Sequence, residues 1–115
     1  MATYFVDVIN GKLMMAFDKI DDIFGVETAV ENGKFYIVAG TKQQVTEVSE
    51  QNGYTMVSVE EVLKVLGRAN VSSAAHNMII SGNIIYMNNV AYLNKASTLM
   101  RLLDLYYSDY LFDNN

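Results

Sequence analysis

The residues that could do chemistry in this chain are few and widely spread. The single histidine, His76, lies in the segment SSAAHNM, close to Ser72 and Ser73. A serine nucleophile needs such a base, but a catalytic triad is defined by geometry, which closeness in sequence does not supply. We place His76 in a polar loop between a helix and a strand, where a histidine is usually exposed and has no catalytic role. We therefore expect no catalytic residue here.

The acidic residues do not have the spacing of a metal site or of an acid–base pair. Asp18, Asp21 and Asp22 are dense enough to suggest calcium, but no oxygen-ligand loop with its glycine surrounds them. Acids are also favoured in the first turn of a helix. Adjacent helical residues point in different directions, so neither Asp21 with Asp22 nor Glu60 with Glu61 converges on a substrate. With one histidine, no cysteine and no phosphate-binding glycine loop, we predict no metal, no cofactor and no enzymatic activity.

Composition and charge exclude further classes of function. A chain of 115 residues is long enough for one domain, and its 51% hydrophobic and 18% charged content is typical of a folded protein. The net charge of −5 would repel nucleic acid and anionic membranes. The start, MATYFVDVINGK, lacks the basic opening of a signal peptide, and no apolar segment has the length to span a bilayer. We expect a cytoplasmic protein that contacts neither nucleic acid nor membrane directly.

A repeat of 42 residues describes how the chain is organised. NGKLMMAFDKIDDIFG (10–25) is followed 42 residues later by NGYTMVSVEEVLKVLG (52–67), and a degenerate third version, NNVAYLNKASTLMRLL, covers 88–103. Three glycine pairs keep the same spacing: Gly11 with Gly53, Gly25 with Gly67, and Gly40 with Gly82. Gly33 alone has no such partner. Shared glycines mark positions where the backbone conformation is constrained. We predict an α+β domain with one core, built from β-hairpin-plus-helix units at approximately 4–45, 46–87 and 88–113.

Each unit is expected to begin with a hairpin and continue into a helix. Asn-Gly or Asn-Asn between apolar residues is a hairpin signal. In the second unit, Ser58 and Glu61 have the spacing of a capping box, in which each satisfies the other's free backbone donor. The stripe Val59, Val62, Leu63 and Leu66 should be buried, and Gly67 should end the helix.

The first unit should follow the same plan, with Asp18 as the helix N-cap and Ile20, Ile23 and Phe24 facing inward. Strands rich in branched and aromatic residues are expected at 35–39 and 78–81, with 84–87 as the hairpin partner of the latter.

The phrase NGYTMVSVEEVLKVLGRANV, followed after a polar gap by MIISG, resembles the copper amine oxidase N-terminal-like domain. The matching residues are Asn52, Gly53, Thr55, Met56, Val57, Leu66 and Gly67. The chain departs from the family pattern at Ser58, where the family has proline, and in lacking the arginines that flank that proline. Members of the family are commonly exported or wall-associated. The resemblance implies a fold unit with a binding or assembly role, and because the domain is an accessory one it implies neither copper nor oxidase chemistry.

The C-terminal segment STLMRLLDLYYSDYLFDNN carries two apolar stripes on one helix. The first is Ala96, Leu99, Leu102, Leu103 and Tyr106, and the second is Met100, Leu103, Tyr107 and Leu111. One stripe is enough to attach a helix to its own core. The second is covered either by the domain wrapping around the helix or by a partner, because Tyr, Met and Phe beside acids are typical of contact surfaces. The predicted protein interface is Met100, Leu103, Asp104, Tyr107, Asp109, Tyr110, Leu111 and Phe112.

These observations predict a noncatalytic protein-binding or assembly module that self-associates through its C-terminal helix, in the simplest form as a homodimer. The alternative is a small acidic inhibitor, of the kind that phages encode, which binds a host protein at a nucleic-acid-binding groove. In that case Asp104, Asp109 and Asp113 would gather on one face and imitate phosphates. Binding that collapses with added salt would favour the alternative.

Overall fold

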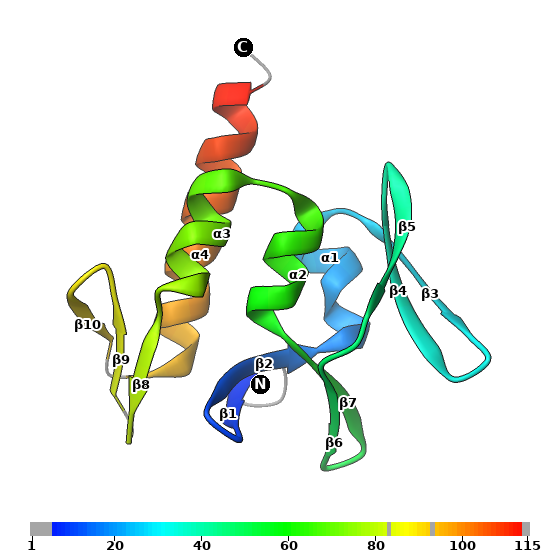
Figure 1. Cartoon of the computed structure of the whole chain (residues 1–115), viewed down its shortest axis with the longest axis horizontal. Coiled ribbons are helices and arrows are strands. Elements are labelled where there is room, and N and C mark those ends of the chain that lie inside the picture. Colours follow the sequence, from blue (N-terminus) through cyan, green and yellow to red (C-terminus); the bar gives the residue numbers. More distant parts are fainter. Residues whose placement is uncertain (1–5, 83, 93, 114–115) are drawn as a thin grey trace.

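The computed structural model describes residues 6–82, 84–92 and 94–113, and side chains as far as Ser108. In these ranges the chain forms an α+β fold, as predicted, with four α-helices and ten strands in three antiparallel sheets (Figure 1). Among the described residues, no helix combines the length and the apolar character needed to cross a bilayer.

The strands and helices have the following bounds. The four-stranded sheet has the order β1 (Val6–Ile9), β2 (Lys12–Ala16), β7 (Tyr54–Ser58) and β6 (Val48–Gln51). The second sheet consists of β3 (Glu27–Glu31), β4 (Lys34–Ala39) and β5 (Thr41–Val45), and the third of β8 (Ile79–Ser81), β9 (Ile84–Met87) and β10 (Val90–Tyr92). The helices are the 3₁₀ turn η2 (Phe17–Lys19), α1 (Ile20–Phe24), α2 (Val59–Leu66), α3 (Ala69–His76) and α4 (Lys95–Asp113).

Four tight turns with positive φ angles at both central residues connect the hairpins. The turns Asn10–Gly11, Asn52–Gly53 and Asn88–Asn89 were predicted and are confirmed. A fourth, Asn32–Gly33, joins β3 to β4. It carries the same sequence signal, which we missed because Gly33 has no partner in the 42-residue spacing.

The two hairpins β1–β2 and β6–β7 meet in the middle of the four-stranded sheet. Strand β2 pairs antiparallel with β7, and the central pair is Met15 with Val57, both fully buried. Every boundary of the second hairpin lies 42 residues after the corresponding boundary of the first. A turn and helix follow each hairpin, η2 with α1 over 17–24 and α2 over 59–66, and both end in a glycine with left-handed φ, Gly25 and Gly67. The predicted inward residues of both helices are buried or packed on the core.

The predicted helix caps are partly wrong. Asp18 is not an N-cap: it lies within η2, which follows Ala16 directly and has no side-chain cap, because burial of Phe17 turns the chain into the helix one residue earlier. Ser58 does cap α2, its Oγ accepting from Glu61 N at 3.3 Å. The carboxylate of Glu61 does not return to Ser58, whose backbone N–H donates to Glu47 O at 3.1 Å. It accepts instead from the backbone N–H groups of Thr46 and Glu47, at 2.8 and 2.9 Å, and so secures the link between β5 and β6.

The chain stops following the 42-residue correspondence after each closing glycine. Residues 27–31 form strand β3, whereas 69–73 lie in helix α3. His76 is therefore the last residue of a helix and not part of a polar loop as predicted. The signal for α3 was present, since Val71, Ala74 and Ala75 have helical spacing and are all buried. The predicted strands at 35–39 and 78–81 agree with β4 and β8, and 84–87 with β9, which pairs with β8.

Burial of Val57 at the meeting of the two hairpins makes the first prediction. Val57→Ala should lower the free energy of unfolding by about 2–3 kcal/mol, because it leaves a cavity between two packed strands. The matched control is Val90→Ala on β10, where Val90 is exposed, and its effect should stay below about 0.5 kcal/mol. Urea denaturation followed by circular dichroism measures both. Equal losses for the two variants would contradict the central position of the β2–β7 pairing.

Candidate functional site

Helix α4 begins with a side-chain cap that the sequence comparison had placed there. Asn94 lies 36 residues after Ser58, and its Oδ1 accepts from Ser97 N at 2.7 Å, as Ser58 Oγ accepts from Glu61 N. The Thr98 hydroxyl donates to the Asn94 carbonyl at 3.1 Å. The helix then continues to Asp113, as predicted from the missing glycine at Leu103.

A charged cluster attaches the start of α4 to the four-stranded sheet. Lys95 Nζ lies 2.6 Å from Asp7 Oδ1 on β1. The same carboxylate accepts from Val8 N at 2.8 Å and from the side-chain amide of Gln51 on β6. The hydrogen bond from Lys95, helped by those from Gln51 and Val8, holds the pKa of Asp7 below its usual value of 3.8 against a smaller opposing effect of burial. One carboxylate thus joins β1, β6 and α4.

The first stripe of α4 faces the core, as predicted. Leu99, Leu102 and Tyr106 are buried, and Leu103 is half-buried against the core. Tyr106 packs edge-on against Phe24 of α1, with ring centroids 5.2 Å apart and planes at 85°. This contact ties the middle of α4 to the end of α1.

The second stripe is exposed as far as the structure describes it. Met100 is 59% exposed and Tyr107 43%, and Asp104 between them is also exposed. The hydroxyl of Tyr107 donates a hydrogen bond to the carbonyl of Ile23 on α1, so its ring is held against the body of the protein. The other predicted interface residues, Asp109, Tyr110, Leu111 and Phe112, lie outside the described side chains. Figure 1 shows the last turns of α4 extending past α3.

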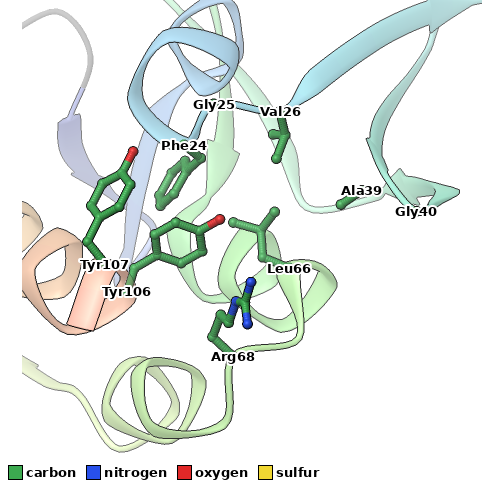
Figure 2. Close-up of a pocket in the computed structure, with 9 residues that line it drawn as sticks. All are labelled: Phe24, Gly25, Val26, Ala39, Gly40, Leu66, Arg68, Tyr106 and Tyr107. Atoms are coloured by element: carbon green, nitrogen blue, oxygen red, sulfur yellow. The ribbon is translucent and has the colours of Figure 1, made fainter. Parts of the chain in front are cut away.

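A cavity of 550 Å³ opens beside Tyr106 and Tyr107, where α1 and α2 end (Figure 2). Its lining is Phe24, Gly25, Val26, Ala39, Gly40, Leu66, Arg68, Tyr106 and Tyr107. The aromatic rings lie on one side, the turn between β4 and β5 lies on the other, and Leu66 and Arg68 lie between them. We did not anticipate this cavity.

A sequence signal for the cavity existed in the 42-residue spacing. Phe24 corresponds to Leu66, and Val26 corresponds to Arg68. Both positions of each pair line the cavity, so it lies where the ends of the two corresponding helices converge. Spacing alone could not show that Tyr106 from α4 closes the same space.

The candidate catalytic residues are not brought together into a reactive group. His76 Nδ1 lies 2.8 Å from Glu60 Oε2, and the histidine side chain is 75% exposed. Ser73 accepts a long contact of 3.5 Å from Asn77 Nδ2 on the same surface. Within the described residues, no group of three or more His, Cys, Asp or Glu side chains is arranged to hold a metal ion. The absence of catalysis stays a prediction.

Comparisons with known protein families, with curated proteins and with solved structures gave no match to this chain. The resemblance to the copper amine oxidase N-terminal-like domain therefore stays a prediction.

The lowered pKa of Asp7 makes a prediction about acid stability. A carboxylate whose pKa is lower in the folded state stabilises the fold above pH 3.8, and this contribution disappears as the pH falls through the folded-state pKa. Asp7→Asn should lower the free energy of unfolding by about 1 kcal/mol near neutral pH and should reduce its dependence on pH below about 4.

Asp22→Asn, at an exposed position on α1, is the control and should leave the acid limb unchanged. Urea midpoints at a series of pH values measure the effect. An acid limb of Asp7→Asn that runs parallel to that of the unaltered protein would show that Asp7 does not anchor α4.

Proposed function

We propose that this protein is a noncatalytic binding and assembly module that self-associates through the outer face of α4. The observation that carries the proposal is the pair of large exposed side chains Met100 and Tyr107 on that face, with half-buried Leu103 beside them. Methionine and tyrosine in contiguous exposed positions are typical of protein contact surfaces. The hydrogen bond of Tyr107 to Ile23 orders its ring before a partner arrives, which reduces the entropic cost of binding.

Charge on the same face favours a second copy of the chain as the partner. Arg101 and Asp104 are both exposed, lie about one helical turn apart and have opposite charges. In a twofold dimer the same patch is used by both subunits. An antiparallel arrangement of two α4 helices centred between Leu102 and Leu103 would place Arg101 against Asp104 of the partner subunit, and the reverse pair by symmetry. The face is therefore complementary to itself.

We also propose that the hairpin-plus-helix unit is an internal repeat. Supporting this are the equal lengths of the two hairpins at an offset of 42 residues, the helical segments 17–24 and 59–66 that follow them, and the left-handed glycines that end both. The third unit is supported by hairpin β9–β10 and by the cap of Asn94 on α4.

The acidic-inhibitor hypothesis and the cytoplasmic location stay predictions. Of the three acids that the inhibitor hypothesis needs, Asp104 is exposed, and its neighbour Arg101 offsets its charge. The side chains of Asp109 and Asp113 lie outside the described ones.

The self-association proposal is tested by exchanging the charges on α4. Asp104→Arg should weaken the dimer at least about tenfold in dissociation constant, because it places like charges opposite each other at two symmetric positions. Arg101→Glu should do the same, and the double variant R101E/D104R should restore association to within about threefold. Sedimentation equilibrium over a range of protein concentrations measures the three constants.

The matched control is Lys64→Glu, which reverses an exposed charge on α2 and should leave the dissociation constant unchanged. Charge exchange is a cleaner test than truncation after Leu105, which would also remove the buried Tyr106. A monomeric unaltered protein at all concentrations would reject the proposal, and a double variant as weak as its parents would reject the antiparallel arrangement.

A further inference from the structure

The cavity at the ends of α1 and α2 has the size and openness of a small-molecule site. Its volume of 550 Å³ lies in the range typical of ligand pockets. Two of its walls are bare backbone: a Cβ atom placed on Gly25 or Gly40 would meet no atom of a non-adjacent residue within 4 Å. A flat molecule can therefore approach the main chain closely at both glycines.

The aromatic wall of the cavity is held in place before any ligand binds. Phe24 and Tyr106 are buried and meet edge to face. Tyr106 and Tyr107 do the same, with ring centroids 5.0 Å apart and planes at 83°. The bond from the Tyr107 hydroxyl to Ile23 fixes the outer ring. Rings in such positions offer faces and edges to a further ring, the arrangement that aromatic pairs prefer.

The charges around the cavity favour a neutral ligand. Among the described residues that line it, Arg68 is the one with a charged side chain. Opposing this positive charge, helices α1 and α2 both end at the cavity, at Phe24 and Leu66, and helix C-termini carry partial negative charge on carbonyl groups. The two effects oppose each other, so neither an anion nor a cation gains much. A guanidinium does attract the face of an electron-rich ring, and helix-end carbonyls accept hydrogen bonds.

We propose that this cavity binds a small, neutral, electron-rich aromatic molecule with an N–H or O–H donor, of the indole or phenol class. The ring would lie against Tyr106 and Arg68, and its donor would reach a carbonyl at the end of α1 or α2. The site is distinct from the outer face of α4 and does not depend on self-association.

Indole is the test ligand, and its isostere benzofuran, which has oxygen in place of N–H, is the matched probe. In titrations of the ¹⁵N-labelled full chain followed by NMR, indole should shift the amide signals of Gly25, Gly40 and Leu66 with a dissociation constant on the order of 1 mM. Benzofuran should bind at least about fivefold more weakly, since it leaves the helix-end carbonyl without a donor. Indole-3-carboxylate and tryptamine, which add a negative and a positive charge, should both bind more weakly than indole.

Two variants locate the binding. Ala39→Leu narrows the cavity and should weaken indole binding more than about tenfold. Ala29→Leu makes the same change on β3, on the opposite face of the same sheet, and should leave indole binding unaffected. Arg68→Gln removes the cation and should weaken binding about threefold.

The outcomes that overturn the proposal are specific. They are the absence of saturable shifts with indole, shifts confined to amides away from the cavity, benzofuran binding as tightly as indole, or equal losses for Ala39→Leu and Ala29→Leu. If Ala39→Leu does not fold, a lack of effect of Arg68→Gln on indole binding overturns it. None of these results bears on the α4 dimer, which is measured separately by sedimentation.

Discussion

The antiparallel pairing of β2 with β7 is the interaction on which the rest of the molecule depends. It joins residues about 42 positions apart, and closing so long a loop has an entropic cost that the contact must offset. Complete burial of Met15 and Val57 and the pairing of both strands on both sides provide that offset. Because α1 and α2 leave from the ends of these neighbouring strands, they lie side by side. A slip of one residue in this register would turn Met15 and Val57 to the opposite face and separate the helices from their core.

The parts of the fold that could be predicted from sequence are those decided by neighbouring residues. An Asn-Gly pair adopts the positive φ angles of a tight hairpin wherever it occurs, so three turns were located correctly and Asn32–Gly33 followed the same rule. Parts decided by distant residues were not predictable. Glu61 has the spacing of a capping partner, yet its carboxylate binds the backbone at Thr46 and Glu47, because pairing of β6 with β7 brings that link within reach. Asp18 failed as a cap for a related reason, the burial of Phe17 against the core.

The candidate sites divide along the same line. The outer face of α4 was visible in sequence, since two apolar stripes on one helix require two surfaces, and Met100 and Tyr107 are indeed exposed while Leu102 is buried. The hydrogen bond from Tyr107 to Ile23 joins residues 84 positions apart, so no local pattern could reveal it. It shows that Tyr107 belongs partly to the domain itself and only its exposed ring surface is available to a partner. Both interpretations of the second stripe thus hold for different atoms of the same side chain.

The cavity exists because the two hairpin-plus-helix units stop matching at the point where their helices end. After Gly25 the chain enters strand β3, and after Gly67 it enters helix α3, so the two segments diverge instead of packing together. The space between them is bordered by corresponding residues, Phe24 with Leu66 at the helix ends, and Val26 with Arg68 just beyond them. Tyr106 comes from α4, which extends far beyond any corresponding helix, and it closes one side without filling the space. Similar units packed about a shared strand pair therefore account for the rigidity of the fold, and the differences between them account for the open space at its surface.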